Sequence, residues 1–156
     1  IQVMVSQNFG ARNALRMVAF LKTACISIFV LSSIFIIIVL SFGEALISIF
    51  VDGEDSEEMV AMALEFVTYV WPIFLFAGIN MLISGYLTAI HLPFQSGMVA
   101  LCRSLIFPTA FLITLYLLVS DYRFVAAIPL AELAAFLIAL VFFFRHLPGR
   151  AIRDIR

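Results

Sequence analysis

The sequence predicts an all-α membrane protein, a four-helix transmembrane bundle that follows the end of a preceding helix. Two observations lead to this prediction. The composition is 65% hydrophobic and only 12% charged, whereas soluble domains have about 45–50% apolar and about 25% charged residues. Four apolar stretches are each about long enough to cross the roughly 30 Å hydrocarbon core of a bilayer. Hydrocarbon is therefore the expected surrounding of much of the chain, and the lipid bilayer its first partner.

The four predicted helices cover about 18–42, 59–90, 98–119 and 124–144. The run from Thr23 to Gly43 contains no charge, and the second stretch has none after Glu65. Arg103 lies near the start of the third, and only Glu132 interrupts the fourth. Short connections make these helices neighbours in an up-and-down bundle. The opening run from Ile1 to Val5 is apolar, so we expect it to be the tail of an earlier helix in a longer protein.

Charge is distributed unevenly between the connections. Of the nine Lys and Arg residues, Arg123 alone falls in the turn between the third and fourth helices; the other eight fall on the opposite side. The positive-inside rule places that basic side in the cytoplasm. Residues 145–156 are then a basic cytoplasmic tail, and the acidic 52–58 loop is external. We expect a multi-pass protein of the cell (inner) membrane.

One proline lies within each of the last three predicted helices, at Pro72, Pro108 and Pro129. An interior proline removes a backbone hydrogen bond and kinks the helix. Membrane helices tolerate this where a neighbour or cavity water satisfies the freed carbonyl. The prolines predict bent helices, which either pack simply or surround a cavity.

Glu132 is the sharpest single feature of the sequence. It lies about 13 Å into the fourth helix at 1.5 Å per residue. A carboxylate at that depth is costly unless it is protonated, paired or facing water. Its small neighbours, above all Ala131 and Ala135, let another helix approach. Glu132 is thus a candidate for cation or proton coupling or for a salt bridge to another helix, or it is a buried acid in a structural role.

A second set of polar side chains follows one face of the second helix. Glu65 is a shallower coupling candidate, and Tyr69, Asn80 and Ser84 are candidates for lining a substrate cavity. A polar stripe on a membrane helix faces protein or water rather than lipid. This leaves interhelical hydrogen bonding and a transport path both open. Arg103 is expected to anchor its helix at the interface.

The chain contains none of the common signatures of catalysis or cofactor binding. Its two cysteines form no CxxC pair, and no spacing of Cys and His suits a metal. No nucleophile–base arrangement and no phosphate-binding glycine loop is evident. We expect no enzyme activity, no bound metal or cofactor, and no nucleic-acid partner.

The order of several short motifs resembles the MATE (multidrug and toxic compound extrusion) family. The segment Gln7–Asn13 is similar to the "YNYGAxN" segment that joins the second and third helices of each half of those transporters. The further matching segments, in order, are Phe66–Pro72, Ile79–Ala89, Arg103 to Pro108, and Ile128–Ala134. Individually the motifs are unspecific, and their order and spacing carry the resemblance over almost the whole chain.

The resemblance implies that the chain is the C-terminal part of the C-terminal lobe of a twelve-helix, two-lobe transporter. It implies an antiporter that exports cationic amphipathic drugs or toxic compounds by alternating access in exchange for H⁺ or Na⁺, and a partner in the missing N-terminal lobe. Two departures stand out: Ala77 occupies the place of an acidic residue found in many members, and His91 replaces a usual glycine. The alternatives are a related lipid-linked oligosaccharide flippase and a non-transport structural membrane protein.

Overall fold

The computed structural model describes residues 1–50, 56–118 and 122–153. The described part is all-helical, in keeping with the predicted fold class. Three helical stretches are long and apolar enough to cross a membrane, or four if a bent pair counts as one span. The elements, in order, are α1 Gln2–Gly10, α2 Ala14–Ser48, α3 Ser56–Val70, α4 Ile73–Ala89, α5 Pro93–Leu101, the π-helical turn η1 Cys102–Ile106, α6 Phe107–Leu118, the 3₁₀ turn η2 Tyr122–Ala126, α7 Ala127–Arg145 and α8 Pro148–Arg153.

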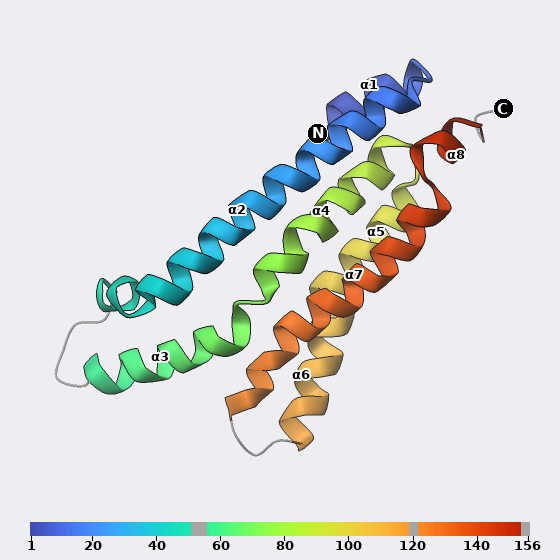
Figure 1. Cartoon of the computed structure of the whole chain (residues 1–156). Coiled ribbons are helices and arrows are strands. Elements are labelled where there is room, and N and C mark those ends of the chain that lie inside the picture. The colour runs from blue at the N-terminus through green and yellow to red at the C-terminus, as the bar shows by residue number, and fades with distance from the viewer. Residues whose placement is uncertain (51–55, 119–121, 154–156) are drawn as a thin grey trace.

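The helix α4 occupies the middle of the bundle (Figure 1). It packs against α2 on one side and α7 on the other, and α6 packs against α7. The short helices α1 and α8 lie at the same end of the bundle (Figure 1). The turn with Arg12, the start of α2 with Arg16 and the basic residues of α8 therefore share one end of the bundle, which we call the basic end.

Local sequence explains where the long helices begin. Asn13 caps α2, because its side-chain oxygen accepts a 3.1 Å hydrogen bond from the backbone N–H of Arg16. Pro93 opens α5 at a position where its missing N–H costs nothing. The helix α2 extends past the predicted end at 42, with a non-helical backbone at Phe42, and then continues to Ser48.

The three prolines act differently from one another. At Pro72 the predicted helix over 59–90 is broken into α3 and α4, which meet at an angle of 49°. Just before Pro108 the chain widens into the π-helical turn η1. Pro129 lies in the first turn of α7, where the proline disrupts little. The expectation of an interior kink was therefore wrong for Pro129.

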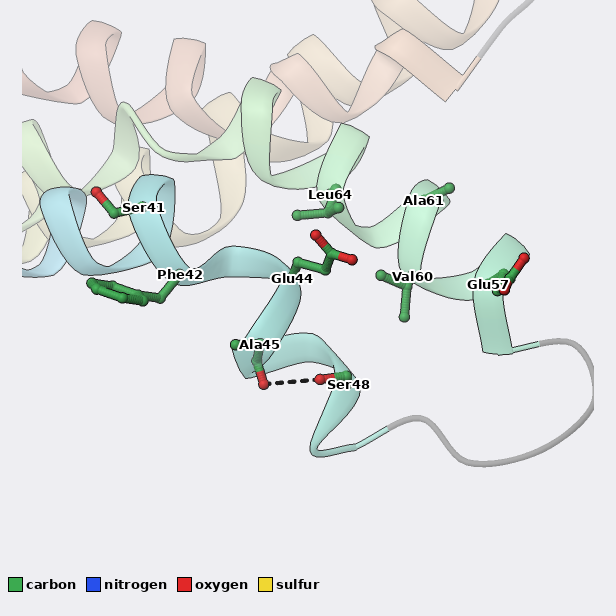
Figure 2. A pocket seen from close by; sticks show the side chains of 9 residues that line it. All are labelled: Ser41, Phe42, Glu44, Ala45, Ser48, Glu57, Val60, Ala61 and Leu64. Atoms are coloured by element: carbon green, nitrogen blue, oxygen red, sulfur yellow. Dashed lines mark hydrogen bonds between the residues drawn. The ribbon is translucent and has the colours of Figure 1, made fainter.

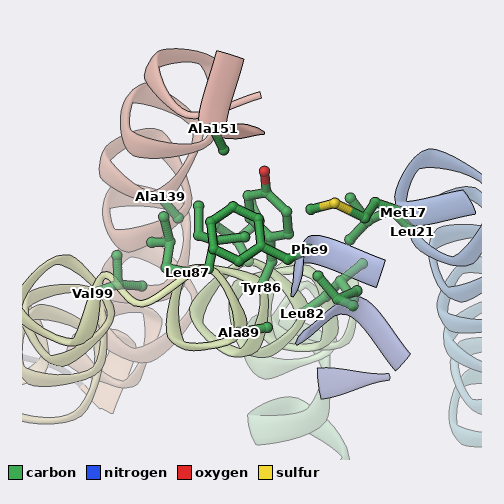
Figure 3. Packing of buried hydrophobic residues seen from close by; sticks show 13 residues of the cluster. Phe9, Met17, Leu21, Leu82, Tyr86, Leu87, Ala89, Val99, Ala139 and Ala151 are labelled. Atoms are coloured by element: carbon green, nitrogen blue, oxygen red, sulfur yellow. The ribbon is translucent and has the colours of Figure 1, made fainter. Parts of the chain in front are cut away.

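The apolar core lies toward the basic end and centres on Tyr86 of α4. Figure 3 shows Phe9 of α1, Met17 of α2 and Ala139 of α7 gathered around this side chain. The Tyr86 ring meets the edge of Phe143, and its hydroxyl donates a hydrogen bond to the carbonyl of His146. Burial of the large ring is thereby combined with satisfaction of its polar atom. Of the two cysteines, Cys102 is buried, whereas Cys25 is exposed on the apolar surface of α2.

Two glycines of α4 give a matched test of helix packing. A Cβ added at Gly78 would lie 2.6 Å from Cγ2 of Ile28 on α2, whereas one at Gly85 meets nothing within 4 Å. We expect Gly78→Ala to destabilise the protein by about 1–2 kcal/mol through overpacking, and Gly85→Ala to be neutral or slightly stabilising. Thermal unfolding in detergent would measure both. Equal melting temperatures for the two variants would show that α2 and α4 do not meet at Gly78.

Candidate functional site

Glu132 lies in the second turn of α7, on the face that packs against α4. Ala131, Ala135 and Ala139 on this helix are buried, and their small side chains allow the close approach. The Glu132 side chain is only 9% exposed. The small neighbours that the sequence predicted around this carboxylate are thus present. What the carboxylate can do chemically depends on the groups that contact it.

Both carboxylate oxygens of Glu132 are engaged, by side chains from two other elements. Arg103 Nε of η1 lies 3.2 Å from Oε1, and Asn80 Nδ2 of α4 donates to Oε2 at 2.7 Å. The same Asn80 nitrogen lies 3.0 Å from the backbone oxygen of Glu132. A buried carboxylate is tolerated when a counter-charge and hydrogen bonds replace its lost hydration. The contact joins α4, η1 and α7 at one point.

The π-helical turn η1 supplies the arginine. In this turn the N–H of Phe107 bonds the carbonyl of Cys102, five residues back. Pro108 has no N–H to offer the carbonyl of Ser104, so a regular α-helical ladder cannot pass this point. Such turns recur at functional sites because they re-aim side chains. Here the turn carries Arg103, which pairs with Glu132 in place of the expected interfacial anchoring.

Asn80 itself is left with an unsatisfied group. Its side chain is fully buried, its nitrogen is committed to Glu132, and its Oδ1 has no hydrogen-bond partner among the described residues. The amide orientation follows from the backbone carbonyl of Glu132, which can only accept a hydrogen bond and therefore requires the donor end of Asn80. The contact with Glu132 therefore fixes which atom of Asn80 is orphaned.

A cavity of about 230 Å³ lies beside this contact. Its lining mixes polar and apolar side chains and is formed by Asn80, Met81, Ser84, Val99, Ala100, Arg103 and Ser104. Two residues, Asn80 and Arg103, belong both to the cavity wall and to the Glu132 contact. The cavity is therefore continuous with the groups that hold the carboxylate.

Three hydroxyls lie closer to the basic end, between α4 and α5. The Ser96 hydroxyl lies 2.9 Å from the Ser84 hydroxyl and 2.8 Å from that of Thr88. Ser96 also donates to the backbone oxygen of Ser84 at 2.9 Å. Ser84 thus connects this cluster to the cavity that it lines.

The sequence-predicted residues are only partly brought together. Asn80 and Ser84 line the cavity, and Asn80 also bonds Glu132. Glu65 and Tyr69 lie on α3, beyond the 49° bend. The bend separates them because the predicted stripe assumed one straight helix. Arg103 and Ser96 were not predicted as site residues. The presence of one cation and one buried carboxylate in neighbouring helices was the signal that could have paired Arg103 with Glu132.

A separate cavity of about 770 Å³ lies between the end of α2 and α3, away from the basic end (Figure 2). Its carboxylates, Glu44 and Glu57, are exposed, and the hydroxyl of Ser48 donates to the carbonyl of Ala45 at 3.1 Å. Exposed acids keep their hydration and need no ligand. Across the part of the chain that the structure describes, no cluster of His, Cys, Asp and Glu could hold a metal ion.

The Arg103–Glu132 pair can be tested by a double-mutant cycle. We expect Arg103→Gln to destabilise the protein by about 2–3 kcal/mol, because Glu132 loses its counter-charge while remaining buried. Adding Glu132→Gln should recover part of this loss, with a coupling of about 1–2 kcal/mol. Thermal unfolding in detergent would supply the values, with Arg145→Gln at the exposed end of α7 as the control. Additive costs for the two single changes would contradict the pairing.

Comparison with known proteins identifies the family. The family model MatE matches residues 1–114, which include α1 to α5, η1 and most of α6. Neither the curated proteins nor the solved structures give a match. The match spans most of the chain and agrees with its apolar, membrane-capable helices. The chain therefore belongs to the MatE family of membrane transporters.

Proposed function

We propose that this chain works as part of a secondary active antiporter, which exports cationic amphipathic drugs or toxic compounds in exchange for H⁺ or Na⁺ by alternating access. In this proposal it forms the C-terminal part of the C-terminal lobe, and the N-terminal lobe of the same protein supplies the facing wall. Membership of the MatE family supports a transporter. The coupling role rests on the structure around Glu132.

The observation that carries the proposal is a buried carboxylate held by a cation and an amide from two other elements. Protonation of Glu132 would remove the charge that holds Arg103 and would change what Asn80 can accept or donate. A conformational equilibrium responds to an ion when the ion binds one state better than the other. Binding of a proton or cation at Glu132 would therefore favour a different arrangement of α4, η1 and α7.

The other candidates take secondary roles in this proposal. Asn80 and Ser84 line the 230 Å³ cavity and are proposed to contact substrate or water. Glu65 and Tyr69 on α3 lie on a different helix, so we place them outside this contact. The alternative of a lipid-linked oligosaccharide flippase calls for free intramembrane cations, and Arg103 is engaged by Glu132. The engagement of Arg103 favours the drug antiporter.

We further propose that the basic end faces the cytoplasm of the cell (inner) membrane, with the C-terminus inside. In a chain without Cys25 and Cys102, a cysteine at Glu57 should react with a membrane-impermeant thiol reagent in intact cells. One at Gly149 of α8 should react only in everted vesicles. Both positions are exposed. The reverse pattern of labelling would refute this orientation.

The functional test compares two carboxylates in the complete transporter. We expect Glu132→Gln to lower drug efflux roughly tenfold, a barrier change of about 1.4 kcal/mol, because glutamine keeps the shape but cannot ionise. Glu65→Gln should have a smaller effect, since Glu65 is exposed. The measurement is efflux from everted vesicles under an imposed pH or Na⁺ gradient at matched expression. Full activity of Glu132→Gln would assign this residue to structure.

A further inference from the structure

We propose that the hydroxyls of Ser84, Thr88 and Ser96, together with the cavities at either end of this cluster, form the route by which protons travel between the basic end and Glu132. The inference deepens the proposed coupling role of Glu132 and rests on it for its physiological meaning. It concerns a path that is separate from the carboxylate itself. The path can therefore be tested without any transport measurement.

The route begins with the spacing of polar residues on α4. Asn80, Ser84 and Thr88 are four residues apart, so they lie on one side of the helix. Ser96 of α5 stands between the last two, with its hydroxyl 2.9 Å from that of Ser84 and 2.8 Å from that of Thr88. The three hydroxyls thus form an unbroken chain of hydrogen bonds along α4.

Each end of this chain opens into a cavity. Ser84 lines the 230 Å³ cavity beside Asn80 and Arg103. Thr88 lines a second cavity, of about 260 Å³, between α1 and the last turn of α4. That second cavity carries polar side chains from α1, namely Gln2, Ser6 and Gln7. Both volumes are large enough for several water molecules, and both offer the polar partners that ordered water requires.

Asn80 gives an independent reason to expect water on the Glu132 side. Its Oδ1 is a buried acceptor without a partner among the described residues. Buried acceptors in native proteins are nearly always satisfied, commonly by ordered water. The nitrogen of the same amide is bonded to Glu132 Oε2. A water molecule bonded to Oδ1 would therefore be separated from the carboxylate of Glu132 only by the amide of Asn80.

The groups along the route are chemically suited to pass a proton. Each hydroxyl can accept one hydrogen bond while it donates another. A proton entering at Thr88 is accepted by a hydroxyl that releases its own proton to the next, so each hydroxyl is unchanged after the transfer. Ser84 then releases a proton to water in the 230 Å³ cavity, and that water protonates Glu132 at Oε1, the oxygen that pairs with Arg103 Nε at 3.2 Å. No bond other than O–H bonds forms or breaks.

Charged and titratable groups close to Glu132 are few in the described part of the chain. Arg103 contacts its carboxylate, and Cys102 beside it is buried. Tyr86 on α4 is bonded to the carbonyl of His146, and Tyr116 on α6 meets Phe124. On α3, Glu65 and Tyr69 are the titratable side chains in the turns that precede α4. None of these described side chains other than Arg103 contacts the carboxylate, and the proposed route accordingly runs through neutral groups.

The experiment measures how fast Glu132 takes up a proton. The chain is reconstituted in bilayers, the pH is lowered abruptly, and the carboxylic C=O stretch is followed by infrared spectroscopy, with Glu132→Gln identifying the band. Ser96→Val removes the central hydroxyl and fills its space. We expect protonation in this variant to be about tenfold slower, equivalent to about 1.4 kcal/mol on the barrier, with the same final extent.

Two variants serve as matched controls. Ser96→Thr keeps the hydroxyl and should keep the wild-type rate. Ser33→Val removes a hydroxyl on α2 that bonds only the carbonyl of Phe29 on its own helix, and it should also leave the rate unchanged. A wild-type rate in Ser96→Val, or equal slowing in Ser33→Val, would overturn the route. Either result would leave the proposed antiport unaffected, because no transport is measured.

A labelling experiment decides the matter if Ser96→Val does not fold. In a background without Cys25 and Cys102, Ala100→Cys places a thiol on the 230 Å³ cavity, and Leu112→Cys places one on an apolar groove of α6. A small hydrophilic thiol reagent should modify the first and spare the second, because only the first cavity holds water. Failure to modify Ala100→Cys, or equal modification of both, would overturn the route.

Discussion

The carboxylate of Glu132 must be compensated wherever α7 crosses the hydrocarbon, and the arrangement of three elements follows from that requirement. Arg103 supplies the counter-charge and Asn80 supplies a hydrogen bond. For them to reach it, α7 must carry small residues on this face and α4 must come close. The turn before Pro108 must also direct an arginine inward. The contact between Glu132, Arg103 and Asn80 therefore constrains the spacing of α4 and α7 as well as compensating the charge.

A second fixed point lies on the same pair of helices, toward the basic end. The hydroxyl of Tyr86 on α4 bonds the carbonyl of His146 just after α7, and the Tyr86 ring packs on Phe143. This contact is independent of charge and is surrounded by the apolar core. A change of charge at Glu132 would thus loosen one connection between α4 and α7 while the other holds. The two helices are therefore joined at two points, of which only the Glu132 contact depends on charge.

Much of the fold could be predicted because hydropathy and helix length are local properties. Four apolar stretches became the membrane-capable helices, and Pro72 broke its helix as expected. Glu132 stood out because a lone acid in an apolar run is costly in any structure. The helix α2 continues beyond the predicted end at 42, since Glu44 interrupts the apolar run without ending the helix. The prediction of an interior kink at Pro129 was wrong because α7 begins directly after η2, and hydropathy does not mark where that short turn ends.

The site could be predicted only in part, because its contacts depend on helix rotation. Asn80 and Ser84 were selected by spacing, and they do line the cavity beside Glu132. Glu65 and Tyr69 were joined to them by assuming one straight helix, and the bend at Pro72 removes that basis. The pairing of Arg103 with Glu132 depends on the π-helical turn. No pattern of residues predicts the direction in which such a turn points its side chains. Ser96 lies in a short segment after the turn at His91, where periodicity carries little information.

The π-helical turn has a consequence for how this sequence can change in length. Such a turn holds one residue more than a regular α-helix would place there. Because the wide turn absorbs that residue, loss of one residue from Cys102 to Ile106 would leave the two flanks close to their present phase but would re-aim the side chains within the turn, Arg103 among them. The helix, its hydropathy and its proline would all survive, yet a different side chain would face Glu132. A change in chain length within this stretch is therefore expected to cost the Arg103–Glu132 pair even where the helix itself persists.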